Sequence, residues 1–184
     1  MMKTSGSDMW TALVARGPAA VKRWLADVEP GQQPSSQRID WLGLAELAAS
    51  KARAQLDLEW ADIALAIYEP LARKMDRQSR KESLMYSAMN LRAFLITRLG
   101  ATEGQPILDP QAIVNWFFDN LATSFDQAST DAAHWRTLDI QRVRELRWIK
   151  NRLAPIKLLM DSGTCPRDSC PELNRWLRIR SQLP

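Results

Sequence analysis

Residues 41–73 carry the most regular pattern in the chain and constrain its fold more than any other stretch. Nine alanines fall in these 33 residues, and small side chains let two helix backbones approach closely. Asp57, near the middle, favours a turn because its carboxylate competes for nearby backbone N–H groups. Apolar residues recur at helical spacings of three and four on both sides of it: Leu42, Ala45, Ala49, Ala52 and Leu56, then Trp60, Ile63, Ile67, Leu71 and Met75. The stretch therefore predicts two helices folded back on each other with an alanine-lined seam.

This hairpin resembles one tetratricopeptide repeat. The residues that carry the resemblance are Leu47-Ala48-Ala49, Ala52, Asp57-Leu58-Glu59-Trp60-Ala61, Leu65 and Tyr68, which place small residues at a helix crossing and large ones beside them. The match covers about one repeat, because one period of about 34 residues further on Leu95 stands where a small residue is expected. The resemblance implies an α-hairpin in a stacked helical scaffold, and a generic antiparallel helical hairpin is the alternative.

Helical periodicity continues along the rest of the chain. Hydrophobic residues make up 46% and charged residues 25%, as in a folded globular protein, and no segment alternates with the period of two that marks strands. Gly17-Pro18 and Asp109-Pro110 read as helix boundaries, and Thr130-Asp131 reads as the start of one long helix to Met160, bent at Pro155. We predict an all-α fold of six or seven helices, as a helical bundle or a short array of tetratricopeptide-like hairpins. Residues 1–7 would be a flexible N-terminus and residues 8–184 a single domain.

Positive charge is concentrated in the last third of the chain. The net charge is +4, and residues 131–184 hold 11 Lys and Arg against 6 Asp and Glu. On the predicted long helix several cations share a sector beside the apolar stripe, and the eight tryptophans exceed what a core needs. The resulting candidate contacts for a partner are Arg136, Arg144, Arg147, Trp148, Lys150, Arg152, Lys157, Arg175, Trp176 and Arg178. A solvated helix face is the alternative for this basic surface.

Four further residues have side chains whose chemical role has to be considered. Arg142 falls at the centre of the apolar stripe, so its guanidinium should end above the core or pair with a buried carboxylate. The single histidine, His134, has no nucleophile on its helical face. Cys165 and Cys170 lack the second ligand pair of a zinc site and read as ordinary thiols, although a short disulfide is an alternative.

No catalytic motif, metal site or glycine-rich phosphate loop rises above chance. We therefore expect a non-enzymatic helical scaffold or adaptor for protein–protein interaction, without a cofactor, as a subunit of a larger complex or bound to its own copies. The alternative is a nucleic-acid-binding accessory subunit that uses the basic face of residues 136–180. The polar start and the absence of a long apolar run predict a cytoplasmic protein with no membrane contact. No small-molecule substrate is inferred.

Overall fold

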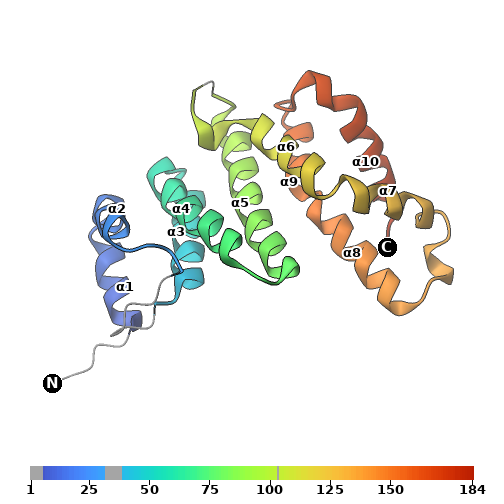
Figure 1. Cartoon of the computed structure of the whole chain (residues 1–184). Helices are drawn as coiled ribbons and strands as arrows, with labels where there is room; N and C mark the ends of the chain where they lie inside the picture. The colour runs from blue at the N-terminus through green and yellow to red at the C-terminus, as the bar shows by residue number, and fades with distance from the viewer. Residues whose placement is uncertain (1–5, 32–38, 103) are drawn as a thin grey trace. The chain divides into compact units, whose positions relative to one another are not determined.

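The computed structural model describes residues 6–31, 39–102 and 104–184 (Figure 1). Within these ranges the chain forms helices α1 to α10 with short 3₁₀ turns between some of them, and it contains no strand. The all-α prediction is confirmed. There are more helices than the expected six or seven, because several predicted helices are divided. No helix in the described ranges is both long and apolar enough to cross a membrane.

Internal contacts divide the chain into two compact units, Met1–Leu91 and Arg92–Pro184. The prediction of a single domain over residues 8–184 is not tested by this division and stays a prediction. Most of the predicted flexible N-terminus, residues 1–5, lies outside the described residues. The helix α5, Gln78–Leu99, runs from the first unit into the second.

The first unit consists of two helical hairpins and the start of α5. Its helices are α1 (Gly6–Ala15), α2 (Pro18–Asp27), α3 (Trp41–Gln55) and α4 (Leu58–Lys74). Gly17 adopts φ 89° between α1 and α2, a conformation that glycine accepts without steric cost. Pro18 then opens α2, as the sequence predicted.

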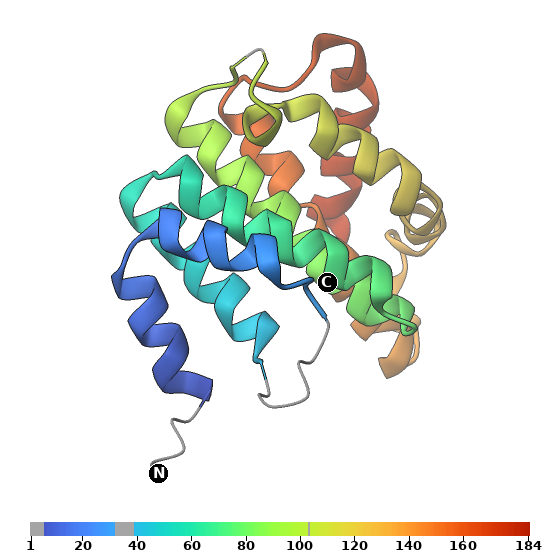
Figure 2. The ribbon, with the colours of Figure 1, turned by 60° about the vertical axis from the view of Figure 1, so that its left-hand side comes forward.

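The first hairpin packs on the second through α2. Figure 2 shows α2 beside α4, and the two helices are joined by an ion pair of 2.9 Å between Lys22 and Asp62. The rings of Trp24 and Trp41 meet at 5.6 Å between centroids, which joins α2 to the start of α3. These two tryptophans therefore serve the packing of the unit rather than a partner.

The α3–α4 hairpin has the predicted alanine seam. Ala45, Ala49 and Ala52 of α3 are all buried. Opposite the small residues, α4 buries a row of larger side chains: Trp60, Ile63, Ile67, Tyr68 and Leu71. Leu42 and Leu56 were expected in the same stripe, but both are exposed. Leu56 lies beyond the end of α3, so the helical spacing no longer governs its direction.

The turn between α3 and α4 depends on two residues. Leu56 adopts the left-handed conformation with φ 53° and its N–H bonds the carbonyl of Ala52. Asp57 then caps α4, because its Oδ1 accepts the N–H groups of Glu59 at 2.7 Å and Trp60 at 3.4 Å. This cap was predicted, and it satisfies backbone donors that the helix itself cannot pair.

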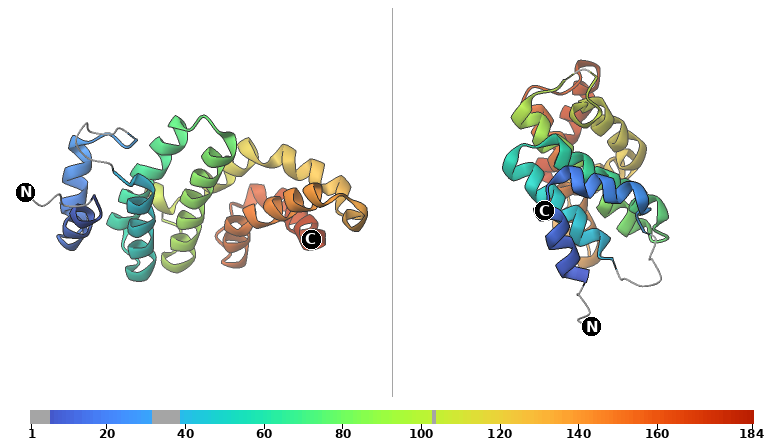
Figure 3. Two further views of the ribbon diagram at one scale, coloured as in Figure 1. Left: turned by 90° about the horizontal axis from the view of Figure 1, so that it is seen from below. Right: turned by 90° about the vertical axis from the view of Figure 1, so that its left-hand side faces the viewer.

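The second unit begins within α5 and holds the remaining helices. They are α6 (Pro110–Asn120), α7 (Ala122–Asp131), α8 (Ile140–Arg152), α9 (Ala154–Asp161) and α10 (Cys170–Gln182). As predicted, Asp109 caps α6 by accepting the N–H of Gln111 at 2.9 Å. The α8 and α9 helices, the orange ribbons of Figure 3, pack together with α6, α7 and α10.

The predicted long helix from residue 131 to residue 160 is not present. Residues 132–139 form a connection with a short 3₁₀ turn at Trp135–Thr137, and α8 starts only at Ile140. A second break falls at Leu153, because Pro155 lies in the first turn of α9 and has no N–H to continue the ladder of α8. Four members of the apolar stripe expected along this helix are buried, Leu146, Ile149, Leu153 and Ile156, whereas Leu138 and Met160 at its two ends are only half-buried.

Candidate interaction surface

The exposed side of α8 is the candidate site, and it is set by the way the helix begins. Asp139 caps α8 by accepting the N–H of Arg142 at 2.9 Å. Leu146 and Ile149 turn to the core and fix the rotation of the helix. The first residue, Ile140, is consequently left 71% exposed, which is unusual for a β-branched apolar side chain of this size.

Ile140, Arg144 and Arg147 lie on one side of α8, because residues separated by three or four positions share a helix face. We call these three residues the α8 face. All three are exposed. Within the part of the chain that the structure describes, neither guanidinium has an acceptor or a carboxylate partner. The α8 face therefore combines an uncovered apolar side chain with two uncompensated positive charges.

Two further candidate cations are exposed in the second unit. The guanidinium of Arg136 lies 5.0 Å from the centroid of the Trp135 ring, in the turn that precedes α8. Arg178 is exposed on α10. No acidic partner for either is found among the described residues, so both remain available to an anionic ligand.

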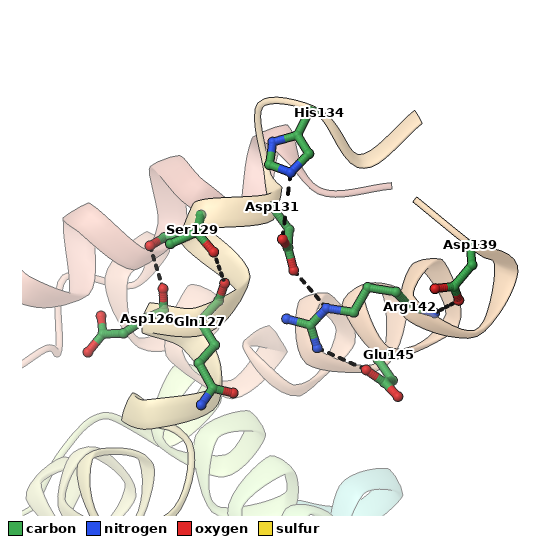
Figure 4. Close-up of polar contacts among 9 residues, drawn as sticks. Asp126, Gln127, Ser129, Asp131, His134, Asp139, Arg142 and Glu145 are labelled. Atoms are coloured by element: carbon green, nitrogen blue, oxygen red, sulfur yellow. Dashed lines mark hydrogen bonds and ion pairs between the residues drawn. The ribbon is translucent and has the colours of Figure 1, made fainter. Parts of the chain in front are cut away.

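Arg142 pairs with two carboxylates, although neither is the buried carboxylate that the sequence predicted: Asp131 is half-buried and Glu145 is exposed. Its Nε donates to Oδ2 of Asp131 at 2.7 Å, and its Nη1 donates to Glu145 at 2.9 Å (Figure 4). The hydrogen bonds that Arg142 donates, first to Glu145 and then to Asp131, raise the pKa of its guanidinium. His134 lies on the other oxygen of Asp131, at 3.8 Å. These contacts join the end of α7 to α8 and leave Arg142 no free charge for a partner.

The side chains of Asp126, Gln127, Asp131 and Arg142 line a shallow hollow between α7 and α8. Its charged members are already engaged, Asp126 with Arg175 at 2.7 Å and Asp131 with Arg142. The hollow also opens broadly to the surface, so it would not enclose a ligand. We therefore assign it to the packing of α7 on α8 rather than to a ligand.

Three of the predicted contact residues are engaged within the unit. Lys150 donates to the carbonyl of Leu183 at 2.8 Å, and its own carbonyl accepts Nε of Arg180 at 3.1 Å, so it fastens the end of α10 to α8. Lys157 pairs with Asp161 on the next turn of α9. Arg175 pairs with Asp126 and Glu172, and the hydrogen bonds that it donates, first to Glu172 and then to Asp126, raise the pKa of its guanidinium.

Three other predicted contact residues are placed in or against the core. Arg152 is only 9% exposed, and its guanidinium lies 4.7 Å from the centroid of the half-buried Trp148 ring. Trp176 is 1% exposed, with its ring 5.1 Å from Phe118 and 5.5 Å from Phe125. Trp148 is therefore only partly accessible to a partner, and Trp176 is a core residue of the second unit.

The cations that were expected to share one sector of a single helix are separated by the start of α8 at Ile140 and by the break at Leu153. Arg136 precedes α8, Arg147 lies on α8 and Lys157 lies on α9, so one helical period does not relate them. Sequence reasoning missed Ile140 as a surface residue. The available signal was Asp139, since an aspartate directly before an apolar periodic run marks a helix start.

Among the described residues no group of three or more His, Cys, Asp or Glu side chains could hold a metal ion. Comparison with known proteins finds no matching family model, no matching curated protein and no matching solved structure. The resemblance to a tetratricopeptide repeat accordingly stays a prediction, and the assignment of function rests on the α8 face itself.

Proposed function

We propose that this chain is a non-enzymatic helical adaptor that binds an acidic segment of another protein through the α8 face. The observation that supports it is the uncovered Ile140 beside Arg144 and Arg147, both without an acceptor among the described residues. Burial of an isoleucine side chain contributes about 1.5–3 kcal/mol. The two guanidiniums supply orientation and faster association, because complementary charge steers an encounter and fixes its register.

The two arginines suit carboxylates by their chemistry and spacing. A guanidinium is planar and can hold a carboxylate with two parallel hydrogen bonds. Arg144 and Arg147 are three residues apart, which corresponds to a rise of about 4.5 Å along the helix axis. Acidic side chains three or four residues apart on a partner helix have a similar spacing. The expected partner segment is therefore acidic and amphipathic, with an apolar residue that covers Ile140.

Nucleic-acid binding is the second candidate function, and the exposed Arg136 and Arg178 favour it. Together with Arg144 and Arg147 they place four uncompensated cations in residues 136–180. Phosphate contacts would give a salt-dependent affinity with little dependence on an apolar side chain. Ile140 thus distinguishes the two proposals, since contacts to phosphates gain little from an apolar side chain, whereas an amphipathic protein partner can bury it.

The test uses the full chain, fluorescent poly-L-glutamate and DNA and RNA oligonucleotides of comparable charge. Binding is followed by fluorescence anisotropy from about 50 to about 200 mM salt, the range over which phosphate contacts lose most of their affinity. Under the adaptor proposal, the Arg144→Glu, Arg147→Glu double variant loses binding to the acidic polypeptide. Ile140→Ser should weaken binding of acidic amphipathic peptides more than binding of poly-L-glutamate.

The matched control is the Arg16→Glu, Arg23→Glu double variant, which changes the charge by the same amount at two exposed arginines of the first unit. It should bind as the unaltered chain does. If charge reversal at Arg144 and Arg147 abolishes oligonucleotide binding and Ile140→Ser leaves it unchanged, the nucleic-acid alternative is favoured. Equal losses in the control variant would show that only net charge matters, and the α8 face would then be abandoned.

A further inference from the structure

Cys165 and Cys170 lie together in the connection between α9 and α10. Both thiols are half-buried and free. The carbonyl of Pro166 accepts from Sγ of Cys170 at 3.3 Å and from Sγ of Cys165 at 3.6 Å, so the two sulfurs converge on one oxygen atom. No other cysteine exists in the chain.

The backbone around the pair holds the two residues in place. Before it, the N–H of Thr164 donates to the carbonyl of Leu159 at 3.1 Å, which ties the start of the loop to α9. Between the cysteines a 3₁₀ turn runs over Arg167–Ser169, with the N–H of Ser169 bonded to the carbonyl of Pro166 at 3.1 Å. Cys170 is the first residue of α10. The approach of the thiols therefore follows from the fold of the loop.

We propose that Cys165 and Cys170 are a reversible oxidation site, at which a hydroperoxide converts the two thiols into an intramolecular disulfide. The thiolate of Cys170 attacks the peroxide oxygen and becomes a sulfenic acid while water or an alcohol leaves. The thiol of Cys165 then attacks that sulfur, the S–S bond forms and a second water leaves. Two thiols are oxidised and one peroxide bond is reduced, and a dithiol reductant reverses the reaction.

The order of attack follows from the surroundings of the two sulfurs. Burial, and then the hydrogen bond with Cys170, raise the pKa of Cys165 to about 12, so this thiol stays protonated at neutral pH. Cys170, the first residue of α10, is the other thiol of the pair. Because Cys165 is held protonated, Cys170 is the residue that attacks the peroxide first, and Cys165 is the residue that resolves the sulfenic acid.

The consequence for the fold is local. The disulfide would close the short loop that leads into α10, whose Arg175 pairs with Asp126 of α7 and whose Arg180 donates to Lys150 of α8. The proposal does not depend on the α8 face, so either can fail while the other stands.

The experiment treats the full reduced chain with one equivalent of hydrogen peroxide at pH 7 to 8. The expected product is a monomer lighter by about 2 Da, the mass of the two hydrogens lost on disulfide formation. Titration under denaturing conditions should find no free thiols, and dithiothreitol should restore both. Digestion and mass spectrometry should place the link between Cys165 and Cys170. A chain that keeps both thiols, reaches only sulfinic acid or forms only intermolecular dimers would overturn the proposal.

Two variants test the order of attack. Cys165→Ser should stop at a sulfenic acid on Cys170 that dimedone traps, because no resolving thiol remains. Cys170→Ser should leave Cys165 much less reactive at neutral pH, since its half-buried thiol is protonated. If Cys165 alone reacts as fast as Cys170 alone, the assignment of first attack to Cys170 is wrong.

Discussion

The carboxylate of Asp131, the last residue of α7, accepts a hydrogen bond from Nε of Arg142 on α8 at 2.7 Å. The eight residues between these helices contain only a single 3₁₀ turn. The Asp131–Arg142 pair therefore ties the start of α8 to the end of α7, and it acts together with the buried Leu146 and Ile149 in holding Ile140 and Arg144 outward.

Replacement of Asp131 by alanine should lower the free energy of unfolding by about 2 kcal/mol, the range for a hydrogen bond to a charged group. Both partners are largely shielded, with side chains 28% and 19% exposed, so solvent weakens the pair only in part. Urea denaturation followed by circular dichroism measures the loss. Glu145→Ala is the control, since this more exposed partner of Arg142 should contribute less than about 1 kcal/mol. Equal losses in the two variants would contradict the special role of Asp131.

Leu56→Gly should stabilise the first unit. Leu56 is held in the left-handed conformation with φ 53°, which costs a residue with a Cβ about 1–2 kcal/mol. Glycine removes that strain, although it also makes the unfolded chain more flexible, so a net gain of about 0.5 kcal/mol is expected. The exposed Leu47, inside α3, is the matched control. Leu47→Gly should destabilise by about 1 kcal/mol, and a loss of stability in Leu56→Gly would refute the strain argument.

The α3–α4 hairpin could be predicted from the sequence because every local signal there agrees. The alanine spacing, the bulky residues of α4 and the cap at Asp57 all point to the same pair of helices. Helix boundaries with a proline were found for the same reason, as at Pro18 and Pro110. The position of Leu56 could not be found, since a left-handed leucine has no marker in the sequence.

The region from Leu121 to Leu153 was predicted less well. The α6–α7 junction at Leu121 and the turn at Trp135–Thr137 contain neither glycine nor proline. The helical spacing of apolar residues therefore continues across both without a break in the sequence pattern. The exposure of each cation then depends on tertiary contacts that no local pattern encodes. Arg144 and Arg152 are both arginines of the same helix, yet one is exposed and the other covers Trp148.

The stability of the first unit should fall above about pH 10, the ordinary pKa of tyrosine. Burial, and then the charge of Glu46, raise the pKa of Tyr68 in the folded chain, while Arg53 opposes them. Below the unfolded pKa the phenol is neutral in both states, and its contribution to stability is fully present. As pH rises through the folded pKa that contribution is lost, because the unfolded chain releases the proton first. Tyr68→Phe should show a smaller loss of unfolding free energy between pH 9 and 11, and equal slopes would contradict the prediction.

Arg152 and Arg144 should differ in what their removal changes, although both lie on α8. Arg152→Ala removes a nearly buried side chain that stacks at 4.7 Å on Trp148, and a shielded contact of a cation with an aromatic ring contributes about 1–2 kcal/mol together with its packing. The variant should therefore unfold at lower urea concentration, and tryptophan fluorescence should report a changed surrounding of Trp148. Arg144→Ala, which loses no contact within the described residues, should change the free energy of unfolding by less than about 0.5 kcal/mol.

In the poly-L-glutamate assay the order reverses, because Arg144 belongs to the α8 face and the guanidinium of Arg152 is held against Trp148. If Arg152→Ala were as stable as the unaltered chain but had lost binding, Arg152 would be assigned to the contact with the partner rather than to the packing of the unit.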